Sequence, residues 1–189
     1  MARERKTAVL DACFLIDWAR YERRELLKAL FDRAFVHREV LDQLVSEGVL
    51  SLASKWLGEG FLAIYPWMDS DEDVALRLIS QLSAMPEIPM LERPDVLCLV
   101  IALRTRSCLL TENKGILRAV EFHPDLSDVK VLTAIDILES LVIEGILQIN
   151  SIDDYIAEVR AYEAQTGHIF SRKRLDESRE RVISWLRRG

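Results

Sequence analysis

Hydrophobic residues along the first 150 positions follow two alternating patterns. Short aliphatic runs bounded by charged or turn residues predict strands, and longer segments with apolar side chains three or four positions apart predict helices. The predicted strands cover residues 7–10, 34–36, 61–65, 107–110 and 129–132. The predicted helices cover residues 14–31, 40–56 with a break at Gly48, 69–82, 95–106, 116–120 and 134–143. Because parallel strands need crossover connections, this order predicts an α/β fold, a three-layer α/β/α sandwich with a mostly parallel sheet of about five strands.

The last part of the chain has only helical patterns. Ser151 begins an N-terminal capping sequence, and a final amphipathic helix is predicted from about Lys173 to Arg187. We therefore divide the chain into an α/β domain over residues 1–150 and a C-terminal helical extension with a basic tail over residues 151–189.

Charge is distributed unevenly along the chain. Residues 171–189 carry seven basic and three acidic side chains, a net charge of +4 in a chain whose total is −6. The basic residues are Arg172, Lys173, Arg174, Arg179, Arg181, Arg187 and Arg188. Such a tail is typical of a segment that contacts nucleic acid or an acidic partner. A solvated helix face, or a tail that folds back on the acidic body, is the alternative interpretation.

Composition excludes several classes of protein. The chain has 189 residues, of which 50% are hydrophobic and 30% charged, as in ordinary globular domains. The longest apolar run, residues 96–103, is far shorter than the roughly 18 residues that cross a bilayer. Asp11 and Asp17 interrupt the apolar stretch after the basic residues Arg3, Arg5 and Lys6, so we expect no secretory signal and a cytoplasmic protein. The three cysteines are predicted to be buried, reduced thiols.

Carboxylate and amide side chains follow the predicted strands at several points. Asp11 comes directly after the first strand, Glu112 and Asn113 come after the fourth, and Asp95 begins the helix before the fourth. The helix after the second strand adds Glu39, Asp42 and Gln43. The carboxyl ends of parallel strands form the functional crevice of an open sheet, so these groups are expected to converge. Converging carboxylates repel one another unless a cation neutralises them, which predicts a Mg²⁺ or Mn²⁺ site. Acids used only as helix caps on an unrelated α/β scaffold are the alternative.

Other catalytic signatures do not occur in the sequence. It contains no Gly-rich phosphate loop, no GxGxxG, no HExxH and no GxSxG motif. The sequence therefore lacks the parts needed for hydride transfer, P-loop hydrolysis and serine-esterase chemistry. The three histidines, His37, His123 and His168, are isolated from one another and are expected to be surface or structural residues.

Four segments together resemble the PIN domain, the metal-dependent ribonuclease fold of VapC-type toxins. They are Val9-Leu10-Asp11-Ala12-Cys13, Val40-x-x-Gln43-Leu44, Asp95 at the head of an apolar helix, and Leu109-Leu110-Thr111-Glu112-Asn113. Residues 129–147 and the helix after them are similar to an archaeal and bacterial PIN-like branch of unknown function. The resemblance covers about residues 7–165, and it lies in the order and spacing of motifs that are individually short.

The resemblance implies a site of acidic residues that binds Mg²⁺ or Mn²⁺ and hydrolyses RNA phosphodiester bonds. Asp11 and Asp95 match the first and third acids of the family, and Thr111 matches its supporting hydroxyl residue. Glu112 is a further implied ligand, and Asn113 positions ligands and substrate. The chain departs from the family at Gln43, where Glu is usual and adjacent Asp42 is the nearest substitute, and at Asn113, where Asp is usual.

These two departures leave two functional hypotheses. Asp11, Asp95 and Glu112 supply a charge of about −3, which suits one divalent cation better than two. The leading hypothesis is a metal-dependent endoribonuclease, and the toxin of a toxin–antitoxin pair is the specific role that the resemblance suggests. The second is a catalytically weakened PIN-like module that binds RNA or a protein partner. The expected partners are RNA, an antitoxin-like protein and a second copy of the chain, and no membrane.

Overall fold

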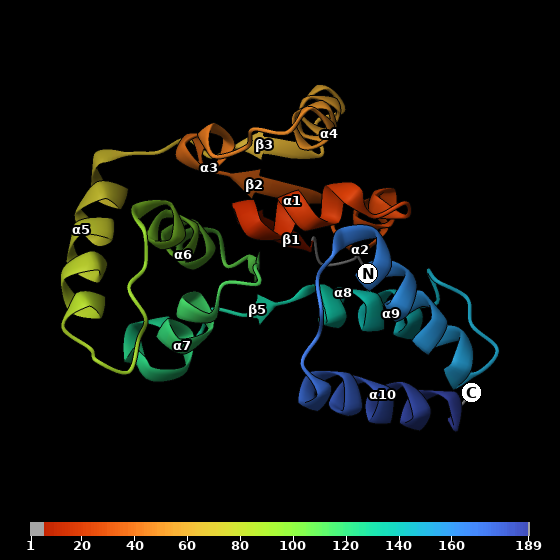
Figure 1. The fold of residues 1–189 in the computed structure, drawn as a ribbon. Helices are drawn as coiled ribbons and strands as arrows, with labels where there is room; N and C mark the ends of the chain where they lie inside the picture. Colours follow the sequence, from red (N-terminus) through yellow and green to blue (C-terminus); the bar gives the residue numbers. More distant parts are fainter. Residues whose placement is uncertain (1–5, 189) are drawn as a thin grey trace, which may run out of the picture.

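The computed structural model describes residues 6–188, and it has the predicted three-layer architecture (Figure 1). Five strands form one parallel sheet in the order β3-β2-β1-β4-β5. The strands are β1 (Thr7–Leu10), β2 (Arg33–Val36), β3 (Leu62–Ile64), β4 (Cys108–Leu110) and β5 (Val131–Leu132). This confirms the expected α/β/α class with a helical C-terminus. The N-terminal residues Arg3 and Arg5 lie outside the described part of the chain.

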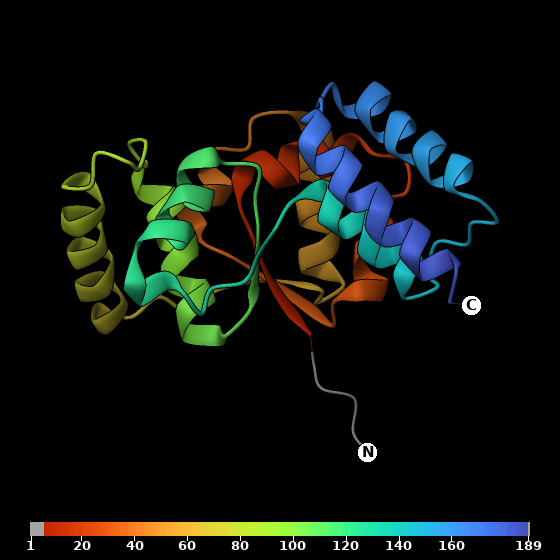
Figure 2. The same ribbon diagram turned by 90° about the horizontal axis from the view of Figure 1, so that it is seen from below.

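Helices cover both faces of this sheet. On one side lie α5 (Asp69–Ser83), α6 (Arg93–Thr105) and α7 (Lys114–Phe122). On the other side lie α1 (Ala12–Arg20), α2 (Leu27–Leu30), α4 (Glu47–Gly58) and α8 (Ala134–Ile143), with the extension α9 (Ile152–Thr166) and α10 (Arg172–Leu186) outside them (Figure 2). Three short helices complete the chain: α3 (Arg38–Asp42), η1 (Arg24–Leu26) and η2 (Pro124–Leu126). No helix among residues 6–188 is long and apolar enough to span a bilayer.

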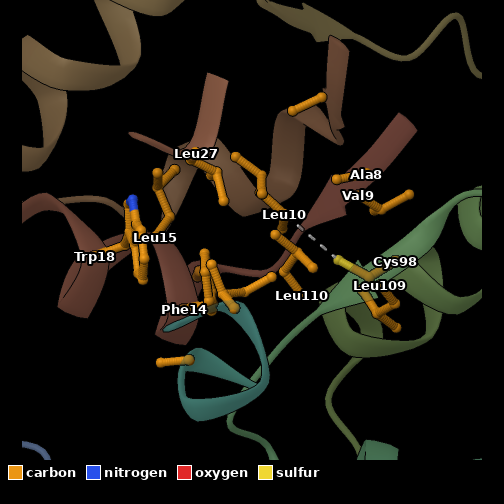
Figure 3. Close-up of a cluster of buried hydrophobic side chains, with 14 of the residues drawn as sticks. Ala8, Val9, Leu10, Phe14, Leu15, Trp18, Leu27, Cys98, Leu109 and Leu110 are labelled. Atoms are coloured by element: carbon orange, nitrogen blue, oxygen red, sulfur yellow. Dashed lines mark hydrogen bonds between the residues drawn. The ribbon is translucent and has the colours of Figure 1, made fainter. Parts of the chain in front are cut away.

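The central strand β1 and helix α6 contain the most completely buried side chains of the described residues. Residues 96–102 of α6 are buried around the whole helix, because α6 packs between the sheet and α5. Figure 3 shows Cys98 of α6 beside the β1 and β4 side chains, with its thiol 4.0 Å from the Leu10 carbonyl oxygen, while the α1 side chains Phe14, Leu15 and Trp18 lie on the other side of these strands. All three cysteines are free thiols, as expected, but only Cys98 is fully buried, whereas Cys13 and Cys108 are partly exposed. The core therefore fixes the relative positions of β1, β4 and α6, the three elements that carry Asp11, Thr111 and Asp95.

Two predicted helices are interrupted in the structure. The segment 14–31 divides into α1, η1 and α2, because Tyr21 leaves the helical conformation and packs its ring against Trp18 and Tyr162. The segment 40–56 divides into α3 and α4 at residues 43–46, so the predicted break at Gly48 is wrong. Gly48 lies in the first turn of α4, where a glycine is tolerated.

The C-terminal extension packs on the α/β body. Tyr155 of α9 hydrogen-bonds Ser178 of α10 at 2.5 Å, and Tyr162 of α9 contacts the Trp18 ring of α1. In α10, Arg181 pairs with Glu139 of α8 at 2.7 Å, and Arg174 donates to the Thr133 hydroxyl at 2.8 Å. Part of the basic tail therefore folds back on the acidic body, while Arg172 and Lys173 point to solvent.

Candidate functional site

Asp11 is the most buried acid at the carboxyl edge of the sheet. It follows β1 directly and caps α1, where its Oδ1 accepts a hydrogen bond from Ala12 N at 2.7 Å. Its Oδ2 accepts the Thr111 hydroxyl at 2.6 Å and the Cys13 thiol at 2.8 Å. Thr111 reaches it because β4 lies beside β1, with Leu110 opposite Leu10. Three donors from two neighbouring strand ends thus hold this carboxylate in place.

Asp95 faces the same pocket from the first turn of α6. Its Oδ2 accepts the backbone N–H of Glu92 at 2.9 Å, which caps the helix. Burial, reinforced by the charge of Asp11, raises the pKa of Asp95 to about 6. The Glu92 N–H and a hydrogen bond from the Asn113 side chain partly oppose this rise in pKa. The two aspartates, far apart in sequence, therefore interact electrostatically across a shared space.

That space is a pocket of about 280 Å³ at the end of the sheet. Its polar lining residues are Asp11, Cys13, Gln43, Glu92, Asp95 and Asn113. Of the residues predicted after β2, only Gln43 lines the pocket. Asp42 is exposed outside it, and Glu39 pairs with Arg93 at 3.2 Å. The structure thus gives Asp42 no place in the pocket as the substitute for Gln43.

Asn113 and Thr111 connect the pocket to α7. The Asn113 side-chain oxygen caps α7 by accepting from Gly115 N at 2.8 Å, and Asn113 N donates to the Thr111 hydroxyl at 2.9 Å. The fit around this cap is tight, because a Cβ on Gly115 would lie 2.6 Å from the Leu91 side chain and 3.1 Å from Asn113 Oδ1. A larger residue at position 115 would have to displace the end of the Leu91 side chain and crowd the Asn113 amide, so glycine suits this cap.

Glu112 points away from the pocket that its neighbour Asn113 lines. Its Oε1 accepts the Ala134 N–H at the start of α8 at 2.6 Å, and its Oε2 lies 3.5 Å from His168 Nε2. Burial raises the pKa of Glu112, and the Ala134 N–H, His168 and Arg174 oppose that rise. The predicted metal role of Glu112 therefore has no support in its contacts, which instead join the β4–α7 loop to α8 and to the loop before α10.

Sequence reasoning missed two residues of this pocket. Cys13 donates to Asp11 and accepts the Glu112 N–H at 3.4 Å, so it connects the two strand-end loops. Burial, together with the neighbouring Asp11 charge, raises the pKa of this thiol far above its usual range, so it stays protonated as a donor. Glu92 lines the pocket as an exposed third carboxylate. The signal for Glu92 was its position three residues before Asp95 and two before Pro94, a pattern typical of a helix N-terminus.

The donor set suits a hard cation that keeps much of its water. No three His, Cys, Asp or Glu side chains within residues 6–188 are grouped so that they alone could hold a metal ion. Mg²⁺, however, is commonly held by one or two carboxylates, and waters and substrate phosphates complete its coordination. Asp11 and Asp95 supply those two carboxylates, and the Gln43 amide adds a neutral oxygen in the same pocket. The residues present therefore fit one such ion.

Comparison with models of known protein families and with curated proteins gives no match for this chain. The resemblance to the PIN domain accordingly remains a prediction carried by the short segments around Asp11, Gln43, Asp95 and Thr111. The structure bears on where these segments lie, because it brings residues of all four to one edge of a parallel sheet.

Proposed function

We propose that this protein is a metal-dependent ribonuclease of PIN-domain type that hydrolyses RNA phosphodiester bonds. One observation carries the proposal: Asp11 and Asp95 face one pocket, and the charge of Asp11 helps to raise the pKa of Asp95. Holding two carboxylates in such proximity is unfavourable unless a positive charge is shared between them. A divalent cation is the usual source of that charge at a phosphodiesterase site.

In this proposal Asp11 and Asp95 hold one Mg²⁺ or Mn²⁺ ion. The ion, when bound, supplies positive charge that stabilises the negative charge developing on the phosphoryl group. Thr111 and Cys13 fix the orientation of Asp11, and Asn113 orients Asp95. Gln43 lies on the pocket wall, where it can bind the ion or a phosphate oxygen. Glu112 acts from outside the pocket by anchoring the loop that carries Asn113.

Calorimetric titration with Mn²⁺ tests the metal site. We expect the wild-type protein to bind Mn²⁺ and the Asp11→Asn/Asp95→Asn variant to lose that binding. Asparagine keeps an oxygen acceptor for both helix caps, so circular dichroism of the double variant should match wild type. Asp42→Asn is the matched control, because it removes an exposed acid beside the pocket lining. Equal binding by wild type and the double variant would contradict the proposal.

Cleavage of a labelled single-stranded RNA tests the reaction itself. We expect cleavage that requires Mn²⁺ or Mg²⁺, is retained by Asp42→Asn and is lost by Asp11→Asn. Metal binding without metal-dependent cleavage by wild type would contradict the proposed ribonuclease and leave only the cation site.

A second candidate function is a non-catalytic module that binds RNA or a protein partner. It is favoured by the hydrogen bonds that the chain itself supplies to both acids, three to Asp11 and a backbone N–H and an amide to Asp95. Such donors offset part of the repulsion without a cation. This candidate predicts that the protein retards RNA in a gel-shift assay but neither binds Mn²⁺ nor cleaves RNA. The ribonuclease proposal predicts RNA binding, Mn²⁺ binding and cleavage.

A further inference from the structure

A second cavity lies at the opposite edge of the sheet, where β1, β4 and β5 begin. Its volume is about 410 Å³, within the range of roughly 300–1,000 Å³ that is typical of small-molecule sites. Three basic residues, Lys6, Arg106 and Lys130, line it together with the thiol of Cys108. An adjoining hollow of about 530 Å³ shares Arg106, Cys108 and Lys130 with it. None of these residues belongs to the acidic pocket.

The positive charge of this cavity is only partly balanced. Lys6 pairs with Glu144 at 2.6 Å, and Asp128 lines the adjoining hollow. The side chains of Arg106 and Lys130 form no hydrogen bond or ion pair with another residue in the range 6–188. Burial raises the pKa of Cys108, and the charges of Lys130 and Lys6 oppose that rise, so both ammonium groups act on the same thiol. Two of the three cationic side chains at the cavity, Arg106 and Lys130, thus have no ion-pair partner in this part of the chain, and Glu144 neutralises the third.

Arg106 has an unusual backbone conformation at this cavity. It ends α6 with φ of +52°, in the left-handed region that L side chains rarely adopt. Gly60, Gly145 and Gly167 take this conformation at the ends of α4, α8 and α9. Arginine is the costlier choice for such a position, because its Cβ disfavours the left-handed region. The Arg106 guanidinium, which has no hydrogen-bonding or ionic partner in residues 6–188, is available to bind an anion.

Apolar side chains also line the cavity, together with Ser140 and Glu144 of α8. Leu30 and Phe31 from the end of α2 line it together with Leu132 of β5 and Ile137 of α8. Guanidinium groups bind phosphate through two parallel hydrogen bonds, and lysine adds a point charge. An aromatic and aliphatic wall accommodates a planar, weakly polar group such as a nucleobase. The cavity therefore combines basic lining residues that can bind an anion with apolar ones.

We propose that this cavity binds a small organic phosphate, a nucleoside monophosphate or a molecule of the same chemistry. Arg106 and Lys130 bind the phosphate, and the wall formed by Phe31 and Leu132 receives the apolar moiety. This site is independent of the proposed ribonuclease, because its residues lie at the other end of the strands. A nucleotide held there would be a ligand rather than a substrate of the acidic pocket.

Calorimetry of the full chain with adenosine monophosphate, adenosine and inorganic phosphate tests the proposal. We expect the monophosphate to bind and the uncharged nucleoside to bind at least tenfold more weakly. Arg106→Gly and Lys130→Gln should each weaken binding of the monophosphate at least tenfold. Arg33→Gln is the matched control, because Arg33 is an exposed cation at the start of β2, outside the cavity.

Three results would overturn the proposal. The first is no binding of the monophosphate by wild type, and the second is unchanged binding by Arg106→Gly. Glycine suits the backbone at position 106, so a retained thermal midpoint would show that a loss of binding is not a loss of fold. The third is equal affinity for inorganic phosphate and the monophosphate, which would show that the apolar lining residues do not contribute to binding. The metal site is tested separately, by comparing Mn²⁺ binding of wild type and the Asp11→Asn/Asp95→Asn variant. The phosphate-binding proposal can therefore fail without affecting the metal proposal, and the reverse also holds.

Discussion

At the carboxyl ends of the strands, Asp11 and Asp95 are surrounded by donors that the chain supplies. At the amino ends, the side chains of Arg106 and Lys130 have no hydrogen-bonding or ionic partner among residues 6–188. The acidic pocket is therefore built into the fold, because its carboxylates cap α1 and α6 and hold Thr111 and Cys13 in place. The basic cavity is not built into the fold in this way, because no helix cap or ion pair depends on the side chains of Arg106 and Lys130. Substitutions should consequently destabilise the protein at the first edge and affect mainly ligand binding at the second.

The largest effect is expected from Thr111→Val, which removes a buried hydroxyl at nearly constant volume. Asp11 loses its shortest hydrogen bond, and Asn113 N loses its acceptor. Hydrogen bonds to charged groups are worth about 1.5–3 kcal/mol, so we expect a loss of about 2 kcal/mol in the free energy of unfolding. Urea denaturation measures it.

Thr111→Ser is the control for this prediction, because it keeps the hydroxyl and removes only a methyl group. Its loss should be clearly smaller than that of Thr111→Val. Similar losses in the two variants would mean that packing, and not the bond to Asp11, stabilises the acidic edge. The difference between the two edges of the sheet would then lose its physical basis.

The fold and the outer arrangement of the site were predictable from sequence for a common reason. The alternation of short aliphatic runs with helical periodicity identifies a parallel sheet, and residues that directly follow its strands must lie at one edge. Asp11 and Thr111 are placed by that rule alone. Of the predicted strand 129–132, only Val131–Leu132 forms β5, although the Lys130 carbonyl still accepts the Leu109 N–H of β4 at 2.8 Å.

The orientation of Glu112 was not predictable in this way. Glu112 and Asn113 are adjacent, yet one caps α8 and the other lines the pocket. The orientation of Glu112 is decided by Ala134 and His168, which are distant in sequence and reach it only in the folded chain. The basic cavity escaped sequence analysis for the same reason, because Lys6, Arg106 and Lys130 each precede a different strand and show no local pattern.

A smaller effect is expected from the pH dependence of Asp95. Its pKa is about 6 in the folded protein against an ordinary value of 3.8, so the folded state binds its proton more tightly than the unfolded state does. This contribution to stability is complete below pH 3.8 and is lost as the pH rises through 6. Because Asp95 is only partly buried, solvent screening reduces it to about 1 kcal/mol.

Asp95→Asn should remove this contribution. We compare the free energy of unfolding of the variant with that of wild type, measured in urea without divalent cations. The difference, variant minus wild type, should be about 1 kcal/mol more positive at pH 7.5 than at pH 4. Asp42→Asn serves as the control for a general change in charge. A constant difference between variant and wild type across this range would show that folding does not raise the pKa of Asp95, which removes one observation on which the metal proposal rests.

The smallest effect, a gain in stability, is expected from Arg106→Gly. Glycine adopts the left-handed conformation at the end of α6 without the penalty of a Cβ, and the guanidinium has no protein partner to lose. We expect a gain of about 0.5–1 kcal/mol in the free energy of unfolding in phosphate-free buffer. Arg106→Ala, which keeps the Cβ, should show no such gain. A loss of stability in Arg106→Gly would mean that Arg106 supports the fold. A structural role would then account for arginine at this position without any ligand. If the gain is observed, adenosine monophosphate should reverse the order, because a ligand that binds only the folded wild type stabilises it by mass action.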